Sequence, residues 1–180
     1  MKTALVIFAE GSEELEAVTV VNILRRAGVT VTFAGLTHGS LRGSRGIVLT
    51  PDTTLDEALN HGYDMVVLPG GQPGTDHLKA DERVLQLLRQ MNQQGKFVAA
   101  ICAAPSVLAS AGLLDQKRAT CYPGSLDDFP QTEVQNTAIV EDGKLITSRG
   151  PGTAMDFSLV LAERLMGKAK RMEVQTGLQR

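Results

Sequence analysis

The sequence predicts an α/β fold in which helices cover both faces of a mostly parallel β-sheet. Short apolar runs alternate with segments of helical periodicity along most of the chain. Several of the apolar runs end at a glycine or at a helix-start signal, and alternating strands and helices are typical of buried parallel sheets. In such sheets ligands bind beyond the carboxyl ends of the strands. Residues that follow a strand are therefore the first candidates for a functional site.

In the first part of the chain, a helix is expected to begin near Ser12, a plausible N-cap that follows the first apolar run. Glu13, Glu14 and Glu16 lie in or beside its first turn, where the helix dipole favours negative charge. The expected elements here are strands at 3–9, 29–35 and 64–68, a short extended segment at 46–50, this helix up to Gly28, and a short helix at 52–60.

In the second part of the chain, the dipeptide Asp142-Gly143 predicts a hairpin. A tight type I′ turn needs positive φ at both central residues, which suits this pair. The expected elements are an amphipathic helix at 81–94, a strand at 96–101, a helix at 104–111, hairpin strands at 137–141 and 144–148, and a final helix at 154–166.

Length and composition predict one soluble domain that spans residues 1–180, with 43% hydrophobic and 21% charged residues. A net charge of -2 gives no electrostatic footprint for sequence-specific nucleic-acid binding, and no segment approaches the roughly 18 apolar residues of a membrane helix. The two cysteines form no disulfide framework, and acids directly follow the first apolar run, unlike a signal peptide. We therefore expect a cytoplasmic protein.

Cys102 lies in the segment VAAICAAP, where a strand runs directly into a helix. A free cysteine is most often an inert core residue, and that alternative stays open. The lack of loop residues, however, places Cys102 on the sharp turn itself, with small alanines that let the backbone fold tightly, as in a nucleophile elbow. The helix dipole is expected to lower the pKa of its thiol, and the Ala103 amide to face an oxyanion formed beside the sulfur.

Pro69-Gly70-Gly71 follows another expected strand. It is either a plain turn or, because glycine amides can approach a ligand closely, a source of oxyanion donors opposite Cys102. The spacing of GGQPG does not fit a dinucleotide fingerprint.

Glu16 lies one helical turn after Glu13, in a helix that starts at the same sheet edge as Cys102. The acidic cluster is explained adequately by the helix N-terminus. A carboxyl turned inward would nevertheless have a raised pKa, donate a hydrogen bond to a thiolate, or act as a general acid and base on a carbonyl.

A Cys-His-acid triad needs a histidine near the sulfur, but His38, His61 and His77 all lie in polar or turn-like segments. His77 is nearest in the chain to the Gly70-Gly71 turn and is the one histidine that could approach the site. No Cys or His pair has zinc spacing, so no metal is expected.

At these residues the sequence resembles the ThiJ/PfpI superfamily, in its branch of Parkinson-disease-associated and bacterial protein deglycases. The resemblance covers nearly the whole chain and is carried by six colinear segments: GSEELEAV (11–18), RRAGVTVTFAGL (25–36), GSRGIVL (43–49), YDMVVLPGG (63–71), VAAICAAP (98–105) and LITSRGPGTAMDF (145–157).

The resemblance implies a flavodoxin-like three-layer sandwich, a homodimer and no cofactor. It places the nucleophile on Cys102, its partner acid on Glu16, and the oxyanion glycines on Gly70 and Gly71, with Ala103 following the nucleophile. Members are described as glyoxalases that turn methylglyoxal into lactate, and as deglycases that release early adducts from side chains and nucleotides. Oxidative-stress sensing and chaperone activity are attributed to the same branch.

The chain departs from many of these relatives at Tyr122, which occupies the place of a histidine. A histidine-relayed mechanism therefore does not carry over, and Tyr122 either donates a hydrogen bond to substrate or caps the pocket. Arg26 and Arg45 match arginines near the family's site and dimer interface, where they would hold an oxidised sulfur or an anionic product. Cys121 is interpreted as structural, with room for a minor redox role.

The leading hypothesis is a cofactor-free glyoxalase or deglycase acting on methylglyoxal or its early adducts. The rival is a redox-sensing stress chaperone in which Cys102 is oxidised to sulfinate. A third class, a cysteine amidase or peptidase, is disfavoured because the histidine partner is missing.

Overall fold

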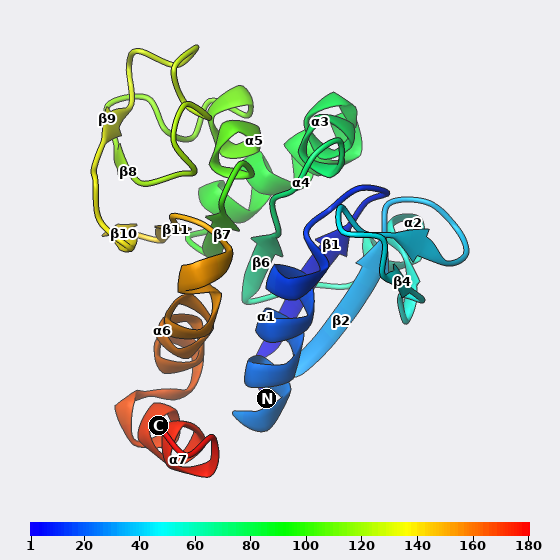
Figure 1. Ribbon diagram of the computed structural model, residues 1–180, viewed down its shortest axis with the longest axis vertical. Helices are drawn as coiled ribbons and strands as arrows, with labels where there is room; N and C mark the ends of the chain where they lie inside the picture. The colour runs from blue at the N-terminus through cyan, green and yellow to red at the C-terminus, as the bar shows by residue number, and fades with distance from the viewer.

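A seven-stranded sheet in the order β10-β11-β7-β6-β1-β2-β5 lies at the centre of the protein (Figure 1). The structure is a computed structural model that describes residues 1–180. All neighbouring strands are parallel except β10, which pairs antiparallel with β11. The strands are β1 (Thr3–Phe8), β2 (Thr30–Gly35), β5 (Thr53–Thr54), β6 (Met65–Leu68), β7 (Phe97–Ile101), β10 (Ile139–Asp142) and β11 (Leu145–Ser148).

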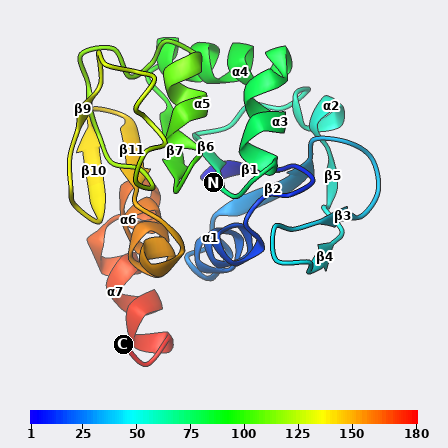
Figure 2. The same ribbon diagram turned by 45° about the horizontal axis from the view of Figure 1, so that its top comes forward.

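Helices cover both faces of this sheet, as the sequence predicts (Figure 2). One face carries α2 (Leu55–Ala58), α3 (Gly74–Ala80), α4 (Glu82–Gln93) and α5 (Pro105–Ser110). The other carries α1 (Glu14–Arg26), α6 (Ala154–Met166), which a 3-10 turn at Pro151–Thr153 precedes, and α7 (Lys168–Gly177).

The side chains of the interior strand β1 alternate between two hydrophobic cores. Leu5 and Ile7 face the core under α3, α4 and α5, whereas Val6 and Phe8 face the core under α1 and α6. All four are fully buried. Successive side chains of a strand point to opposite faces, so a strand buried on both sides must be apolar throughout, as the run TALVIF is.

The carboxyl ends of β1, β6 and β7 lie at one edge, because these three strands are adjacent and parallel. The acidic segment follows β1, the Gly70-Gly71 turn follows β6, and Cys102 follows β7. The expected α/β fold is confirmed, and so is the convergence of the three candidate segments.

Several elements differ from the sequence prediction. The expected helix at 52–60 is an edge strand, β5, followed by the single helical turn α2, which a capping box of Thr54 and Glu57 starts. The extended segment at 46–50 is β4 (Val48–Leu49), which forms a small hairpin with β3 (Leu41–Arg42). Helices α3 and α7 and the short parallel pair β8 (Arg118–Ala119) and β9 (Glu133–Val134) were not predicted from the sequence.

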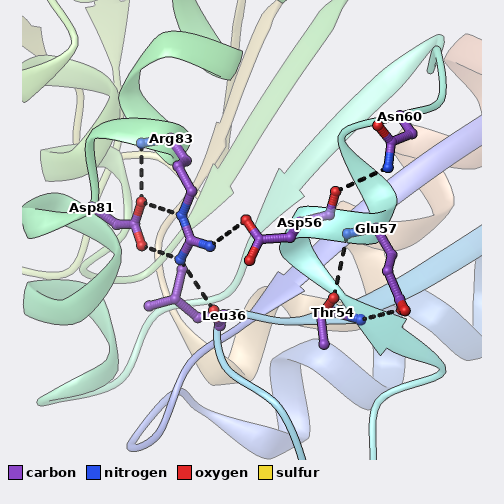
Figure 3. A network of polar contacts seen from close by, with 7 residues as sticks. All are labelled: Leu36, Thr54, Asp56, Glu57, Asn60, Asp81 and Arg83. Atoms are coloured by element: carbon purple, nitrogen blue, oxygen red, sulfur yellow. Dashed lines mark hydrogen bonds and ion pairs between the residues drawn. The ribbon is translucent and has the colours of Figure 1, made fainter.

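A network around Arg83 ties α4 to α2 and to the chain after β2 (Figure 3). Its guanidinium donates to both carboxylate oxygens of Asp81, to Asp56 at 2.7 Å and to the Leu36 carbonyl at 3.2 Å. Asp81 is also the N-cap of α4. A planar guanidinium suits such a multidentate junction, which fixes the helical layer against the sheet.

None of the helices has the combination of length and apolar character that spanning a membrane requires.

Candidate functional site

Cys102 occupies the turn between β7 and α5, as its sequence context predicts. Its φ is +65°, a left-handed conformation that a residue with a side chain rarely adopts. The surroundings hold it there: its amide donates to the Ser148 carbonyl at 3.0 Å, and its carbonyl accepts from the Tyr122 amide at 2.7 Å. The residue is 8% exposed, so the sulfur lies at the bottom of an open site.

The turn after β6 lies directly against Cys102 because Gly70 has no side chain. A Cβ at Gly70 would lie 2.6 Å from the Cβ of Cys102 and 2.9 Å from the Ala103 nitrogen. This close approach brings the amide of Gly71 to the sulfur, and the amide of Ala103 reaches it from the other side. Both amides act to lower the pKa of the thiol. Two convergent amides beside a nucleophile have the geometry of an oxyanion hole.

Glu16 reaches the same point from the first turn of α1 and is fully buried. Its Oε2 accepts a 2.7 Å hydrogen bond from the Gly70 amide, while Oε1 meets no partner with hydrogen-bond geometry. The pKa of this carboxyl is raised to about 7, mainly by burial and further by the negative charge of Glu13. Hydrogen bonds from the Gly70 amide and the Cys102 thiol act in the opposite direction. Near neutral pH, Glu16 is therefore able both to give and to take a proton.

Burial also raises the pKa of the Cys102 thiol to about 12, and the negative charge of Glu16 contributes to this rise. The expectation that the helix dipole lowers this pKa is therefore wrong. Helix α5 begins only at Pro105 and is six residues long, so the two amides act alone against burial. Cys102 and Glu16 consequently titrate as a pair, which gives up one proton near neutrality and strongly resists losing the second.

The other two glutamates of the acidic cluster hold the β3–β4 loop. Glu14 is 3% exposed and accepts hydrogen bonds from the amides of Arg45, at 3.0 Å, and Ile47, at 3.1 Å. Burial alone would raise the pKa of Glu14, but its own amide and those of the loop outweigh burial and hold the pKa below its ordinary value. Glu13 accepts from the Ser44 hydroxyl at 2.9 Å and pairs with the Arg45 guanidinium at 3.8 Å.

A cavity of about 330 Å³ opens above the sulfur. Its walls come from the N-cap of α1, the β3–β4 loop, the turn after β6, the nucleophile turn, the loop at 122 and the start of the 3-10 turn at 151. The lining residues are Glu13, Ser44, Arg45, Gly71, Gln72, Cys102, Ala103, Tyr122 and Pro151.

Most of the residues that the sequence singles out meet in this cavity, but Gly70 and Arg26 do not act as expected. The Gly70 amide is committed to Glu16, so it is not free as an oxyanion donor. Arg26 lies in the last turn of α1, where it bonds Asn22 and lines a different cavity. His77 bonds the Glu10 carbonyl and also lines a separate cavity.

Sequence reasoning missed four lining residues: Glu13, Ser44, Gln72 and Pro151. Glu13 belongs to the acidic cluster, whose position at a helix N-terminus accounts for its charge without a role in the site. Ser44 and Pro151 come from segments that are distant from Cys102 in the chain. Neither segment has a helical or strand periodicity that would place it at the site. The structure brings together no group of three or more His, Cys, Asp or Glu side chains able to hold a metal.

A larger cavity, of about 480 Å³, lies away from Cys102. It lies along the outer side of α1 against β2 and β4, and Val18, Val21, Phe33 and Leu49 supply its apolar lining. Its lining contains no cysteine and no acidic residue, so size alone does not identify the site.

Comparisons with known proteins agree with this geometry. A family model described as "DJ-1/PfpI family" matches residues 2–164. Protein dj-1beta of Drosophila melanogaster is 45% identical over 180 residues, which cover 98% of this chain and 96% of that protein. Its crystal structure superposes with a TM-score of 0.95 over 99% of this chain and 97% of that one.

Two further relatives carry informative names. A Caenorhabditis elegans protein named glutathione-independent glyoxalase DJR-1.2 is 32% identical over 173 residues, covering 94% of this chain and 91% of that protein. The structure of Toxoplasma gondii DJ-1, described as oxidized, is 35% identical, has a TM-score of 0.95, and covers 99% of this chain and 98% of that one.

The raised pKa of Glu16 predicts a pH-dependent contribution to stability. Its folded value of about 7 exceeds its ordinary value of 4.5, so the folded state binds the proton more tightly. This contribution is complete below pH 4.5 and is lost as pH rises through 7, a change of about 3 kcal/mol. Glu16→Gln cannot ionise, so its stability should not show this loss. The free energy of unfolding of the variant minus that of the parent should therefore rise by about 3 kcal/mol between pH 4.5 and 8.

Urea unfolding at several pH values measures this difference, and Glu14→Gln is the matched control on the same helical turn. Because the pKa of Glu14 is lowered below its ordinary value of 4.5, its contribution to stability is lost only as pH falls below 4.5. The difference between Glu14→Gln and the parent should therefore stay nearly constant over the range in which that of Glu16→Gln rises. A pH-independent difference between parent and Glu16→Gln would contradict the raised pKa.

Proposed function

The chain belongs to the DJ-1/PfpI family, and from that premise we propose that it is a cofactor-independent glyoxalase and deglycase that acts through Cys102 and Glu16. The observation that carries the proposal is a single geometric one. A buried carboxyl with a pKa of about 7 lies beside a thiol at a strained turn, and two backbone amides face the same sulfur. The name of the C. elegans relative supports the substrate class.

The first proposed step is attack of the Cys102 sulfur on the aldehyde carbon of methylglyoxal. A thiol with a raised pKa needs a base, and the Glu16 carboxylate is placed to take its proton as the C–S bond forms. The aldehyde oxygen becomes an alkoxide that the Gly71 and Ala103 amides stabilise, and its protonation gives a hemithioacetal.

The second proposed step moves a proton between the two substrate carbons. Glu16 removes the proton from the former aldehyde carbon to give an enediol and returns a proton to the neighbouring carbon. The result is a lactoyl thioester: one carbon is oxidised and the other reduced, so no external redox partner is needed. Water that enters through the open cavity then cleaves the thioester to lactate and restores the thiol.

The deglycase activity uses the same chemistry on an adduct. The cavity is open to solvent, and Tyr122, 53% exposed, lies at its rim together with Arg45. An early methylglyoxal adduct of a side chain or nucleotide can therefore present its carbonyl carbons to Cys102 while the rest stays outside. The cytoplasmic location expected from the sequence remains part of this proposal.

A specific feature favours redox sensing as a second candidate function. The amides that would hold a substrate oxyanion are equally suited to the oxygens of a Cys102 sulfinate. The relative described as oxidized is of the same fold. A protonated Glu16 would add a third donor to a sulfinate.

We also propose that the protein is a homodimer formed through the α1–β4 surface, defined here as Leu15, Val18, Ile47 and Val48. These apolar side chains are 48–58% exposed, and they adjoin the large cavity beside α1 that Arg26 lines. Contiguous exposed apolar side chains mark protein interfaces. The prediction of Arg26 at a dimer interface belongs to this surface rather than to the catalytic cavity.

Conversion of methylglyoxal to lactate tests the catalytic proposal. Purified protein should form lactate without added glutathione, and Cys102→Ala should abolish the reaction. Glu16→Gln keeps the shape but cannot shuttle a proton, so kcat/KM should fall by about 10²- to 10⁴-fold. In the parent, kcat/KM should rise with pH through about 7 as Glu16 ionises. A parent that forms no lactate, or a Cys102→Ala variant as active as the parent, would exclude the proposal.

Mild peroxide treatment tests the redox candidate. Intact-mass analysis should show a gain of two oxygens on the parent, absent in Cys102→Ala and retained in Cys121→Ala. An unchanged mass, or oxidation that resides on Cys121, would count against Cys102 as a sensor.

Sedimentation tests the dimer. The parent should sediment as a dimer and Val18→Glu as a monomer, since a charge on that surface would be buried unpaired. Met172→Glu on α7, where the side chain is 58% exposed, is the control and should remain dimeric. A monomeric parent, or a dimeric Val18→Glu, would rule out this interface.

A further inference from the structure

A second cavity, of about 340 Å³, adjoins the one above Cys102. Tyr122 and Pro151 line both cavities, so the two share a wall. The remaining walls of the second cavity are Pro123 and the loop from Arg149 to Thr153. This loop directly follows Ser148, whose carbonyl accepts the hydrogen bond from the Cys102 amide, so the second cavity is anchored to the nucleophile turn.

Arg149 is the arginine in this chain whose guanidinium has no partner. Every other arginine side chain forms an ion pair or a hydrogen bond within the protein. Arg149 is half-buried and lines the second cavity, where the protein supplies no carboxylate to it. Asp127 lies exposed on the neighbouring loop, and its charge and that of Arg149 both act on the pKa of Cys121. Asp127 and Arg149 nevertheless form no ion pair.

The other charges around Cys102 compensate each other. The guanidinium of Arg45 faces Glu13 at 3.8 Å. Glu16 is kept largely neutral below pH 7 by burial. The uncompensated charge nearby is therefore the positive charge of Arg149, which lines the adjoining cavity, where a half-buried charge is less screened than in open solvent.

We propose that Arg149 and Tyr122 form an anion subsite that binds a carboxylate or phosphate group carried by the electrophile that Cys102 attacks. A guanidinium offers two parallel donors to such a group, and the Tyr122 hydroxyl offers a third. This proposal rests on the proposed function in one respect, namely that the electrophile attacked by Cys102 is a substrate. It makes Arg149 a specificity-determining residue: carbonyl compounds with an anionic group close to the reacting carbon are preferred over neutral ones.

Alkylation of Cys102 by iodoacetate and by iodoacetamide tests this subsite without any turnover. The two reagents have similar size and chemistry and differ in charge, and peptide mass analysis assigns the modification to Cys102 rather than Cys121. The rate with neutral iodoacetamide corrects for changes in thiol ionisation or access. The ratio of the iodoacetate rate to the iodoacetamide rate should fall about three- to tenfold in Arg149→Gln.

Two variants control for charge and fold. Arg149→Lys keeps the charge and should retain most of the parent ratio. Arg89→Gln removes the same charge from α4, where Arg89 pairs with Glu82 at 2.9 Å and lines neither cavity, and it should leave the ratio unchanged. An unchanged ratio in Arg149→Gln, or an equal fall in Arg89→Gln, would overturn the subsite.

Protection by simple anions identifies the group that binds. Inorganic phosphate and acetate, at matched ionic strength, should slow iodoacetate alkylation in the parent and not in Arg149→Gln. Stronger protection by phosphate points to phosphate-bearing electrophiles, and stronger protection by acetate to carboxylates. No protection by either anion would overturn the proposal.

The outcome is separable from the glyoxalase assay. If the parent forms lactate but the alkylation ratio does not depend on Arg149, the subsite fails and the proposed function stands. If the ratio depends on Arg149 but no lactate forms, the proposed function fails and the anion subsite stands.

Discussion

The site depends on one buried contact, between the carboxyl of Glu16 and the thiol of Cys102. A fully buried carboxyl is costly as an anion, and here the Gly70 amide holds one of its oxygens, while the other oxygen has no hydrogen-bond partner. The neighbouring backbone is arranged around this contact. Cys102 takes a left-handed turn, and Gly70 lies where any side chain would collide with it. Neither acid nor thiol ionises independently, so the chemistry belongs to the pair.

Periodicity and turn residues predicted the central fold because its strands are buried on both faces and its long helices are amphipathic. The run TALVIF and the pattern Val84, Leu87, Leu88 and Met91 leave few alternatives. The elements that were missed or wrong are short or exposed. Helix α2 is a single turn, and β8 and β9 pair two residues each through contacts distant in the chain. Helix α7 has one buried residue, Val174, so its sequence shows little apolar pattern.

The site was partly predictable, because Cys102, Glu16 and Gly71 each follow a strand of the central sheet and strand ends converge. The pattern could not show which atom faces which. Gly70 binds Glu16 rather than an oxyanion, and Arg26 points along the far end of α1. The direction of the Cys102 pKa shift also required coordinates, because burial outweighs two favourable amides. Glu13 and Glu14 accept hydrogen bonds from Ser44 and Arg45 of the β3–β4 loop, about thirty positions away in the chain. No local sequence pattern predicts contacts over such a separation.

Carboxyl ¹³C NMR of Glu16 as a function of pH tests the central contact most directly, with Glu16→Gln used to assign the resonance. We expect the carboxyl to be still protonated at pH 6, well above its ordinary value of 4.5, because burial raises its pKa to about 7. A carboxyl already ionised at pH 6 would contradict the account, since Glu16 would then hold no proton to exchange with Cys102.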